Sequence, residues 1–444
     1  MHIELPDKVK KIIAVIEAGG YEAYAVGGCV RDSLLGRTPS DWDITTSASP
    51  QQIKALFGRT IDTGIEHGTV TVMMDREGFE VTTYRIDGEY EDNRHPRDVT
   101  FTPELTEDLR RRDFTINAMA YNDRNGLVDV FGGIDDMEKK IIRCVGNPKE
   151  RFGEDALRMM RAVRFSAQLG YAIEDGTKAA IGEMAGNLEN ISAERIQSEL
   201  VKLLVSSHPD YLRFCYETGI TKIILPEFDR CMETEQNNPH HCYTVGEHIL
   251  HSLNGVDGEK ALRLTMLFHD IGKPETKFTD EKGIDHFHGH AAEGERITRQ
   301  VMHRLRFDND TLYKVARLVL YHDYPVEISA KSVRRAMNKI GEDIFPYLFD
   351  VKKADISAQS EYCVEEKTEK LAEIRKIYEM ILENRQCVSL RTLAVTGKDL
   401  IEAGMKPGRE IGEMLDRLLQ AVLEKPEENT KEKLMEQVRR WTAK

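Results

Sequence analysis

The sequence predicts an α+β fold, with a small mixed sheet near the N-terminus followed by an all-helical remainder. Three observations lead to this prediction. Strand-like and helix-like runs alternate over the first 150 or so residues. From about Asp155 the apolar periodicity becomes helical, and strand-like alternation hardly returns. A chain of 444 residues is too long for one ordinary core, so we expect two to four domains.

Local signals define the N-terminal elements in turn. Gly19 and Gly20 end the first expected helix, Ser49 is a preferred N-cap for the third, and residues 76–78 form the turn of an expected hairpin. In chain order, the expected elements are helices over residues 9–17, 30–35 and 50–57 and strands over residues 23–26, 42–45, 69–74 and 79–86.

Composition places the chain among soluble globular proteins. Charged residues make up 31% of it, no apolar run approaches the roughly 18 residues of a membrane helix, and no signal-peptide pattern follows Met1, so we expect a cytoplasmic protein. Seven scattered cysteines fit reduced thiols. A net charge of −14 argues against indiscriminate coating of nucleic acid but allows a local basic face, which we expect within residues 109–164.

The most informative motif is a glycine turn beside two aspartates. Gly27 and Gly28 allow a close backbone approach to a ligand, and Arg31 with free backbone N–H groups could bind a phosphate chain. On a strand, Asp41 and Asp43 would leave the same face and could share divalent metal, as two-metal phosphoryl transfer requires. Each feature alone is more often a plain turn or a solvated pair. Together they indicate chemistry on a nucleoside triphosphate.

Two later segments supply groups for the ribose and the base. Arg112 would bind phosphate, and Asp113 could accept a hydrogen bond from a ribose hydroxyl. Asp155, Arg158 and Arg161 share one face of a predicted helix. An aspartate that accepts from an exocyclic amine, beside an arginine that donates to a ring nitrogen, would take cytosine and adenine and reject uracil and guanine. The alternatives are a charged helix start and a weak intrahelical ion pair.

In this order and spacing, the motifs closely resemble those of class II CCA-adding enzymes (tRNA nucleotidyltransferases) of the polymerase-β superfamily, which also contains bacterial poly(A) polymerases. The matching motifs are Gly27–Asp32, Asp41–Asp43, Arg111–Asp113 and Glu154–Arg158. The resemblance implies a polymerase-β-like catalytic domain in which Asp41 and Asp43 are catalytic and hold Mg²⁺, with Glu80 a weaker candidate. The nucleotide-binding residues that it implies are Gly28, Arg31, Arg112, Asp113, Asp155, Arg158, Arg161 and Arg164.

The resemblance continues along nearly the whole chain. Residues 87–96 look like the flexible loop that the family uses when it switches from adding C to adding A, and enzymes that add only CC lack this loop. Residues 191–196 resemble the next family helix, and residues 397–429 resemble the tail that holds the tRNA elbow.

Histidines concentrate in the middle of the chain, where eight of the fourteen lie between His240 and His290. With the pair His269–Asp270, their order resembles the HD superfamily of metal-dependent phosphohydrolases. The implied metal ligands are His248, His269, Asp270, His290, His322 and Asp355. Mixed nitrogen and oxygen ligands suit Mg²⁺, Mn²⁺ or Ni²⁺. Asp323 could replace a ligand or support one. A lone histidine is more often a core or surface residue, and His240, His241, His251, His286 and His288 receive no role.

The resemblance implies four domains: a nucleotidyltransferase catalytic domain (1–150), a helical neck for base and RNA binding (151–235), an HD domain (236–360) and a helical tRNA-binding tail (361–444). The expected function is template-independent addition of CCA to the tRNA 3′ end. The 3′-hydroxyl would attack the α-phosphorus and pyrophosphate would leave. The expected partners are tRNA, CTP and ATP, with neither DNA nor a membrane.

Four alternatives stay open. The chain could be an A-adding enzyme or a poly(A) polymerase, a group that tends to carry a basic C-terminal extension. It could be an HD phosphodiesterase or nucleotidase whose N-terminal domain only binds nucleotide. It could also be a noncatalytic RNA-binding module, which would have no need for two paired carboxylates.

Overall fold

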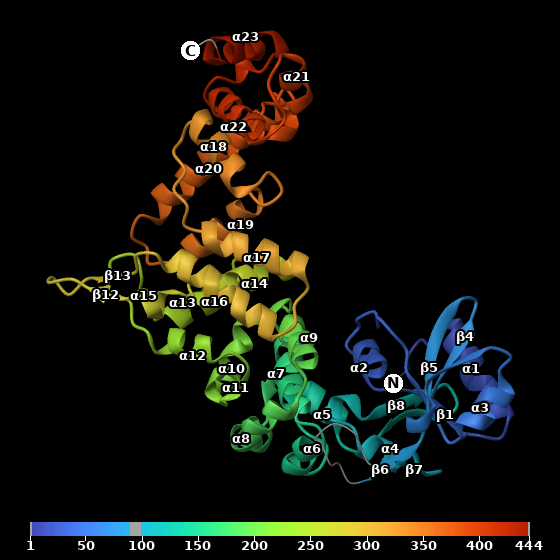
Figure 1. The fold of residues 1–444 in the computed structure, drawn as a ribbon. Helices are drawn as coiled ribbons and strands as arrows, with labels where there is room; N and C mark the ends of the chain where they lie inside the picture. The colour runs from blue at the N-terminus through green and yellow to red at the C-terminus, as the bar shows by residue number, and fades with distance from the viewer. Residues whose placement is uncertain (1, 89–98, 443–444) are drawn as a thin grey trace. The chain divides into compact units, whose positions relative to one another are not determined.

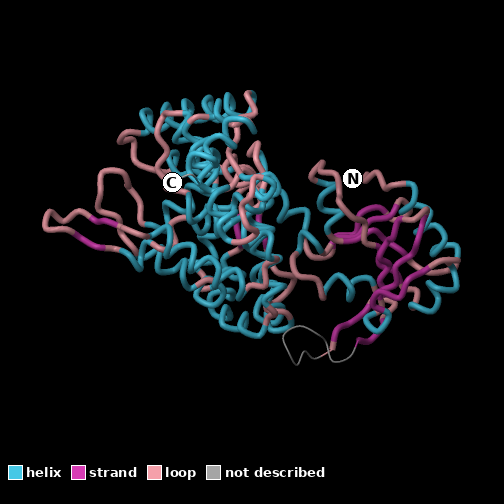
Figure 2. Tube along the Cα trace, turned by 45° about the horizontal axis from the view of Figure 1, so that its top comes forward, coloured by secondary structure: helices cyan, strands magenta, loops and turns pink. Residues whose placement is uncertain are grey.

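A computed structural model describes residues 2–88 and 99–442 of the chain. It divides into two compact units, Met1–Pro226 and Glu227–Lys444. The main sheet belongs to the first unit, and the second is almost entirely helical (Figures 1 and 2). The predicted α+β class is therefore confirmed. The finer division into four domains stays a prediction.

A seven-stranded mixed sheet organises the first unit. Its strand order is β3 (Thr60–Gly64), β4 (Thr69–Met74), β5 (Glu77–Thr83), β2 (Ile44–Thr46), β1 (Ala23–Val26), β8 (Met119–Asn122) and β9 (Gly126–Asp129). Strands β2 and β5 pair in parallel, and the other neighbours are antiparallel. Helix α1 (Asp7–Ala18) buries Val9, Ile12 and Ile16 in the same core as the apolar side chains of β2, β4 and β5.

Most N-terminal elements lie where the sequence predicts them. Helix α2 (Gly28–Leu34) follows β1, and α3 (Pro50–Leu56) begins at Ser49, whose hydroxyl accepts from the Gln52 N–H in a reciprocal capping box. The hairpin β4–β5 turns at Asp75 and Arg76, which both have positive φ.

Two predicted strands have wrong boundaries: the strand over residues 42–45 and the second strand of the hairpin. Strand β2 begins only at Ile44, where its register with β1 starts, so Asp41 and Asp43 precede the strand instead of lying on it. Strand β5 ends at Thr83, because the chain then leaves the main sheet. Its continuation β6 (Arg85–Asp87) pairs with β7 (Val99–Phe101) in a separate two-stranded sheet.

The rest of the first unit is mostly helical, apart from a short parallel pair of strands, β10 (Ile141–Ile142) and β11 (Ala172–Ile173). These helices are α4 (Leu105–Arg110), α5 (Gly133–Glu138), α6 (Pro148–Glu154), α7 (Leu157–Leu169), α8 (Asp175–Met184), α9 (Ala193–Leu204), α10 (Leu212–Glu217) and α11 (Ile220–Ile224). The helix predicted to carry Asp155, Arg158 and Arg161 on one face is wrong at Asp155. That residue has extended φ and ψ of −141° and 105°, and its carboxylate accepts from the Leu157 N–H at 3.1 Å at the start of α7.

The second unit is built from helices with two short strands, β12 (Phe278–Thr279) and β13 (Asp285–His286). The helices are α12 (Pro226–Glu233), α13 (Val245–Leu253), α14 (Lys260–Phe268), α15 (Lys273–Thr276), α16 (His290–Arg304), α17 (Asn309–Tyr321), α18 (Ala330–Ile340), α19 (Tyr347–Ser357), α20 (Val364–Glu383), α21 (Gly397–Glu402), α22 (Arg409–Glu424) and α23 (Lys431–Thr442). Within the described ranges, no helix combines the length and apolar character needed to cross a membrane.

Candidate catalytic and metal sites

Asp41 and Asp43 lie on the exposed segment between α2 and β2. Crowding by protein atoms raises the pKa of the Asp43 carboxyl, although much of the residue is exposed. The Arg112 charge opposes this rise, while the negative charges of Asp41 and of Glu80 on β5 add to it. Three carboxylates therefore lie close enough to repel one another. A divalent cation would relieve that repulsion, so their chemistry fits a metal.

The glycine turn packs directly against an arginine from far along the chain. Gly27 has a φ of +82°, and a Cβ built there would lie 2.9 Å from Arg112 Nη1. The backbone conformation requires glycine, and a larger residue would also have to displace the Arg112 guanidinium. Arg31, which is buried, donates to Asn117 Oδ1 at 2.6 Å and forms a two-pronged interaction with Asp32. The turn thus brings two guanidinium groups to one place.

Asp108, which sequence reasoning did not single out, anchors the neighbouring arginines. It is fully buried, pairs with Arg111 at 2.8 Å and Arg112 at 3.5 Å, and accepts from Thr45 Oγ1 at 3.0 Å. Burial alone would raise its pKa, but the two arginines lower it, so the carboxylate stays charged. The sequence signal that could have identified Asp108 is its spacing, since it precedes Arg111 by three residues and Arg112 by four.

Asp113 is also buried, and both of its carboxylate oxygens accept hydrogen bonds. Oδ1 accepts from the Phe114 N–H at 2.9 Å and from Asn117 Nδ2 at 3.1 Å, while Oδ2 accepts from Arg161 Nε at 2.8 Å. Burial opposes ionisation, yet the Arg161 charge and the hydrogen bonds from Asn117 and Arg161 bring its pKa down to about 2. A ribose hydroxyl would therefore meet a fixed, fully ionised acceptor.

The structure does not pair Asp155 with Arg158. Because the helix breaks between them, Asp155 forms a salt bridge of 2.7 Å with Arg195, and Arg158 pairs with Glu154 and donates to the Arg111 carbonyl at 3.0 Å. The prediction of one shared helical face is wrong at Asp155. Asp155 still keeps acceptor positions beyond its two observed hydrogen bonds, since an ionised carboxylate has about four.

An aromatic ring that sequence reasoning missed lies amid the arginines. The Phe165 ring centre lies 3.9 Å from the Arg164 guanidinium, 5.0 Å from Arg31 and 5.3 Å from Arg161. Arg164 also pairs with Glu199 at 2.8 Å, and burial lowers its pKa to about 10. The ring and its cation contacts fix the side chains that would face a triphosphate.

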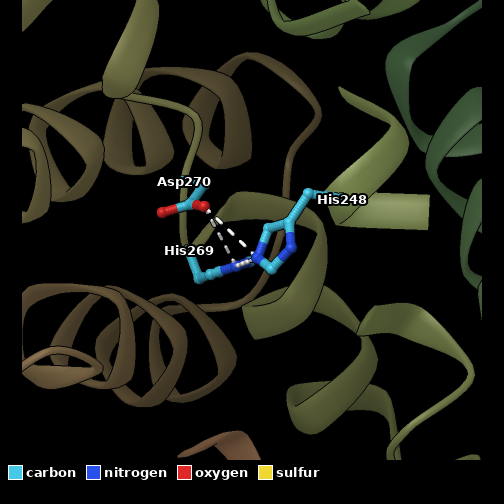
Figure 3. Close-up of side chains that lie close together, drawn as sticks. All are labelled: His248, His269 and Asp270. Carbon is cyan, nitrogen blue, oxygen red and sulfur yellow. Dashed lines mark hydrogen bonds and ion pairs between the residues drawn. The ribbon is translucent and has the colours of Figure 1, made fainter. Parts of the chain in front are cut away.

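In the second unit, the six predicted ligands converge from separate helices. His248 lies on α13, His269 and Asp270 follow α14, His290 begins α16, His322 follows α17, and Asp355 lies on α19. His248 Nε2 lies 3.2 Å from His269 Nε2 and 3.5 Å from Asp270 Oδ2 (Figure 3). The same nitrogen lies 2.9 Å from Asp355 Oδ1. On the other side, His290 Nε2 and His322 Nε2 lie 3.2 Å apart and each 3.7 Å from Asp270 Oδ1.

Backbone carbonyls fix the tautomer of all four imidazoles. The Nδ1 atoms of His248, His269, His290 and His322 lie 2.7–3.1 Å from the carbonyl oxygens of Ala358, Met266, Phe287 and Val319, respectively. A carbonyl can only accept, so each Nδ1 carries a proton, and each ring in its neutral form presents an unprotonated Nε2. Two lone pairs then face each other at 3.2 Å in each half of the cluster, an arrangement that fits a cation between them.

The electrostatics of this cluster, named here the histidine–aspartate cluster, also fit metal. Asp270 Oδ2 is buried and accepts no hydrogen bond, although Lys273 Nζ lies 2.7 Å away. Burial lowers the pKa of His269 to about 4, which keeps that ring neutral. Burial would also lower the pKa of His322, but the hydrogen bond and charge of Asp270 raise it, because this carboxylate favours a cation. Two ligand groups, His248–His269–Asp270 and Asp270–His290–His322, share Asp270.

Other predicted features fall outside the two sites. Asp323 is exposed and makes no described contact with the ligand groups, His286 pairs with Asp280 at 3.0 Å, and His251 stacks on Tyr243. The predicted flexible loop lies almost wholly at residues 89–98, outside the described residues.

Comparison with known proteins gives consistent results. Models of the poly A polymerase head domain, of the probable RNA and SrmB-binding site of polymerase A, and of a putative tRNA nucleotidyltransferase domain 2 match residues 23–143, 170–232 and 290–438. The CCA-adding enzyme of Enterococcus faecalis is 34% identical over 437 residues, 97% of this chain and 96% of that protein.

Other relatives align over shorter stretches. The CCA-adding enzyme of Lactiplantibacillus plantarum is 55% identical over 223 residues, 50% of this chain, and that of Limosilactobacillus reuteri is 51% identical over 203 residues, 46% of this chain. In these alignments the chain spans about half the relatives' length, 53% and 50%.

Solved structures share the whole fold. The CCA-adding enzyme of Bacillus stearothermophilus in complex with CTP is 31% identical, with a TM-score of 0.73 over 99% of this chain and 100% of that one. A Thermotoga maritima CCA-adding enzyme complexed with tRNA, 20% identical with a TM-score of 0.59 over 98% of each chain, shows the same fold.

Proposed function

The chain belongs to the CCA-adding enzyme family, and from this premise we propose that it adds CCA to the 3′ end of tRNA from CTP and ATP without a nucleic-acid template. One observation carries the proposal. The four predicted motifs, which are spread over more than a hundred residues, meet: Gly27 lies against Arg112, the Arg112 charge acts on Asp43, and Arg158 donates to the Arg111 carbonyl at 3.0 Å. A relative of 31% identity that is solved with CTP supports the substrate class.

Each side chain receives a role from its position. Asp41 and Asp43 would hold Mg²⁺, which when bound activates the attacking hydroxyl and neutralises the leaving pyrophosphate. Arg31, Arg112 and the Gly28 backbone bind and orient the triphosphate. Asp113, kept ionised by Arg161, accepts from the ribose.

Base selection is assigned to Asp155 and Arg158, each held by a different partner. Asp155 is fixed by Arg195 and by the N-terminus of α7, and Arg158 by Glu154 and a backbone carbonyl. Arg161 and Arg164 complete the nucleotide contacts. Because the reading groups are rigid, a mismatched base would leave buried polar atoms without partners, which is a costly form of rejection.

The proposal also assigns a role to each larger region of the chain. We assign catalysis to residues 1–150, base and RNA binding to 151–235, and tRNA binding to 361–444. The segment 87–96 is assigned to the switch from C to A addition.

The test uses three tRNAs that end before CCA, after C and after CC, each incubated with Mg²⁺ and labelled CTP or ATP. We expect C addition to the first two and A addition to the third. Failure on all three would contradict the proposal, A addition to the third alone would indicate an A-adding enzyme, and long A tails on unrelated RNA would indicate a poly(A) polymerase.

A second function is favoured by the facing Nε2 atoms of the histidine–aspartate cluster. We propose that residues 236–360 form an HD-type phosphohydrolase, with His248, His269, Asp270 and Asp355 holding one divalent ion and Asp270, His290 and His322 a second. Mg²⁺, Mn²⁺ or Ni²⁺ would suit this ligand set. When bound, such ions polarise a phosphoryl oxygen and supply a nucleophile at neutral pH.

This second function is tested by metal-dependent phosphate release from simple phosphate esters. His269→Ala should abolish release and leave nucleotide addition intact, whereas Asp43→Ala should do the opposite. Equal release by the wild type and His269→Ala would remove the cluster from the reaction.

A further inference from the structure

Two cavities adjoin at the histidine–aspartate cluster. One, of about 710 Å³, is lined by Asp270, His290 and His322. The other, of about 310 Å³, lies against its side. Six residues line both: His322, Asp323, Tyr324, Asp355, Gln359 and Lys367. The second cavity therefore opens from the same wall that carries two of the candidate metal ligands.

The larger cavity is suited to an anion. Lys273 and Lys367 line it, and Lys367 Nζ is held at 2.5 Å by Gln359 Oε1, while Gln359 Nε2 donates to Asp355 at 3.2 Å. A chain of hydrogen bonds thus fixes a cation beside a metal ligand. Ammonium groups and divalent ions together are the usual partners of phosphate.

The smaller cavity has a different chemistry. Its walls include Val326, Phe345 and Phe349, each no more than 7% exposed and each part of the apolar core of the second unit. A cavity of about 150 Å³ with apolar walls holds benzene. A volume of about 310 Å³ is therefore sufficient for one or two fused rings.

Lys352 marks the junction between the apolar walls and the metal ligands. It lines the smaller cavity from α19, and the charges of Asp323 and Asp355 act on it. Within residues 2–88 and 99–442, its ammonium forms no hydrogen bond or salt bridge. A partly buried lysine of this kind is placed to bind an oxygen of a bound ester.

We propose that the smaller cavity receives the aromatic group of a phosphate ester whose phosphate lies at the histidine–aspartate cluster, with Lys352 at the ester oxygens. The proposal rests on the phosphohydrolase function proposed above and names its substrate class. The apolar walls would select the organic group, and the cluster with Lys273 and Lys367 would bind the phosphate.

Binding tests the proposal independently of turnover. Phenylphosphonate and methylphosphonate, two nonhydrolysable probes, are titrated by calorimetry into the full chain loaded with Mn²⁺. Because a buried ring removes apolar area from water, we expect phenylphosphonate to bind at least about tenfold more tightly. Equal affinities for the two probes, or no binding of either, would overturn the proposal.

Two pairs of variants locate the binding. Val326→Phe fills the cavity and should reduce the phenyl preference to about twofold or less with methylphosphonate affinity unchanged. Ile328→Phe, on an exposed residue that does not line the cavity, should preserve the preference. Lys352→Met should weaken both probes about tenfold, and Lys353→Met, at the exposed next residue, should weaken neither.

The same samples separate the two proposals. A retained phenyl preference without metal-dependent hydrolysis of phenyl phosphate would support the cavity assignment and sink the hydrolytic function. Hydrolysis of phenyl phosphate and glycerol phosphate at equal rates, unchanged in Val326→Phe, would support the hydrolytic function and overturn the cavity assignment.

Discussion

The two candidate sites differ in whether their charged side chains are paired with one another. In the first unit, buried carboxylates and guanidinium groups neutralise one another: Asp108 with Arg111, Asp113 with Arg161, and Glu199 with Arg164. In the second unit, four imidazoles and two carboxylates point at one another, and the Lys273 ammonium contacts a single carboxylate oxygen, Asp270 Oδ2, at 2.7 Å.

This difference indicates when each site binds metal. Asp41 and Asp43 are exposed and offer few ligands, and magnesium at such a site is usually completed by substrate phosphates. The histidine–aspartate cluster offers two groups of three candidate ligands before any substrate arrives. We therefore expect the first site to gain metal with its nucleotide and the second to retain metal through purification.

The largest expected effect separates the two sites by activity. Asp43→Asn removes one metal-binding charge, so nucleotide addition to tRNA should fall by about 10³-fold or more while phosphate release stays unchanged. Addition is measured with labelled CTP on a tRNA that ends before CCA. Asp62→Asn, on exposed strand β3, is the control and should retain addition. Substantial addition by Asp43→Asn would remove this carboxylate from catalysis.

The next effect concerns metal content. Asp270 offers one oxygen to each ligand group, so Asp270→Asn should lower the retained metal from about two ions per chain to nearly none. Asp355→Asn, which affects one group, should leave about one. The exposed neighbour Asp323 is the control, and Asp323→Asn should keep both ions. Metal per chain is measured by mass spectrometry of desalted protein, and equal loss in all three variants would contradict the shared-ligand arrangement.

These sites show how far the sequence alone could lead. Local signals located Ser49 as a cap and Gly27 as a turn, because capping and positive φ depend on neighbours in the chain. The spacing of Asp155 and Arg158 indicated a shared face only if the helix were continuous, and the aspartate side chain instead caps a new helix. The sequence could have indicated this cap, since aspartate is favoured at the start of helices.

What the sequence could not show are the long-range partners. The pairing of Asp113 with Arg161, of Arg164 with Glu199, and the position of Phe165 among three guanidinium groups arise only when separate helices pack. The six candidate metal ligands, and their division between two ions, were predicted from residue types and order. That one carboxylate, Asp270, belongs to both ligand groups required the geometry.

A smaller effect tests the ion pair between Asp113 and Arg161 in the first site. Arg161→Met leaves Asp113 buried without its main cation, which should cost about 2–3 kcal/mol, reduced from the roughly 3–5 of a fully buried pair because Arg161 is one third exposed. Unfolding is followed by Trp42 fluorescence in a Trp441→Phe background, since the chain has two tryptophans. Arg37→Met, at an exposed arginine, should change stability by less than about 0.5 kcal/mol.

The difference in unfolding free energy between the wild type and Arg161→Met should also depend on pH. The folded-state pKa of Asp113, about 2, lies below its ordinary value of 3.8, so its ion pair stabilises the fold above about pH 4. That stabilisation is lost as the pH falls through 2. The difference in unfolding free energy between the wild type and Arg161→Met should therefore narrow between pH 4 and pH 2. A constant difference over this range would exclude the ion pair as its source.

The smallest expected effect concerns Phe165. Phe165→Leu removes the ring that contacts three guanidinium groups, and we expect KM for CTP and ATP to rise about three- to tenfold with kcat nearly unchanged. Phe214→Leu, which removes a ring beside Lys178 elsewhere in the same unit, is the matched control and should not alter KM. A fall in kcat alone would indicate a role other than positioning the arginines.

The central claim is that one chain carries two separate centres, one for nucleotide addition and one built around the histidine–aspartate cluster. The rate of CMP and AMP addition by Asp270→Asn tests it most directly, measured after metal analysis has shown that the cluster ions are lost and circular dichroism that the chain is folded. We predict a rate within about twofold of the wild type. A tenfold or greater loss in this folded, metal-free variant would show that the two centres are not separate.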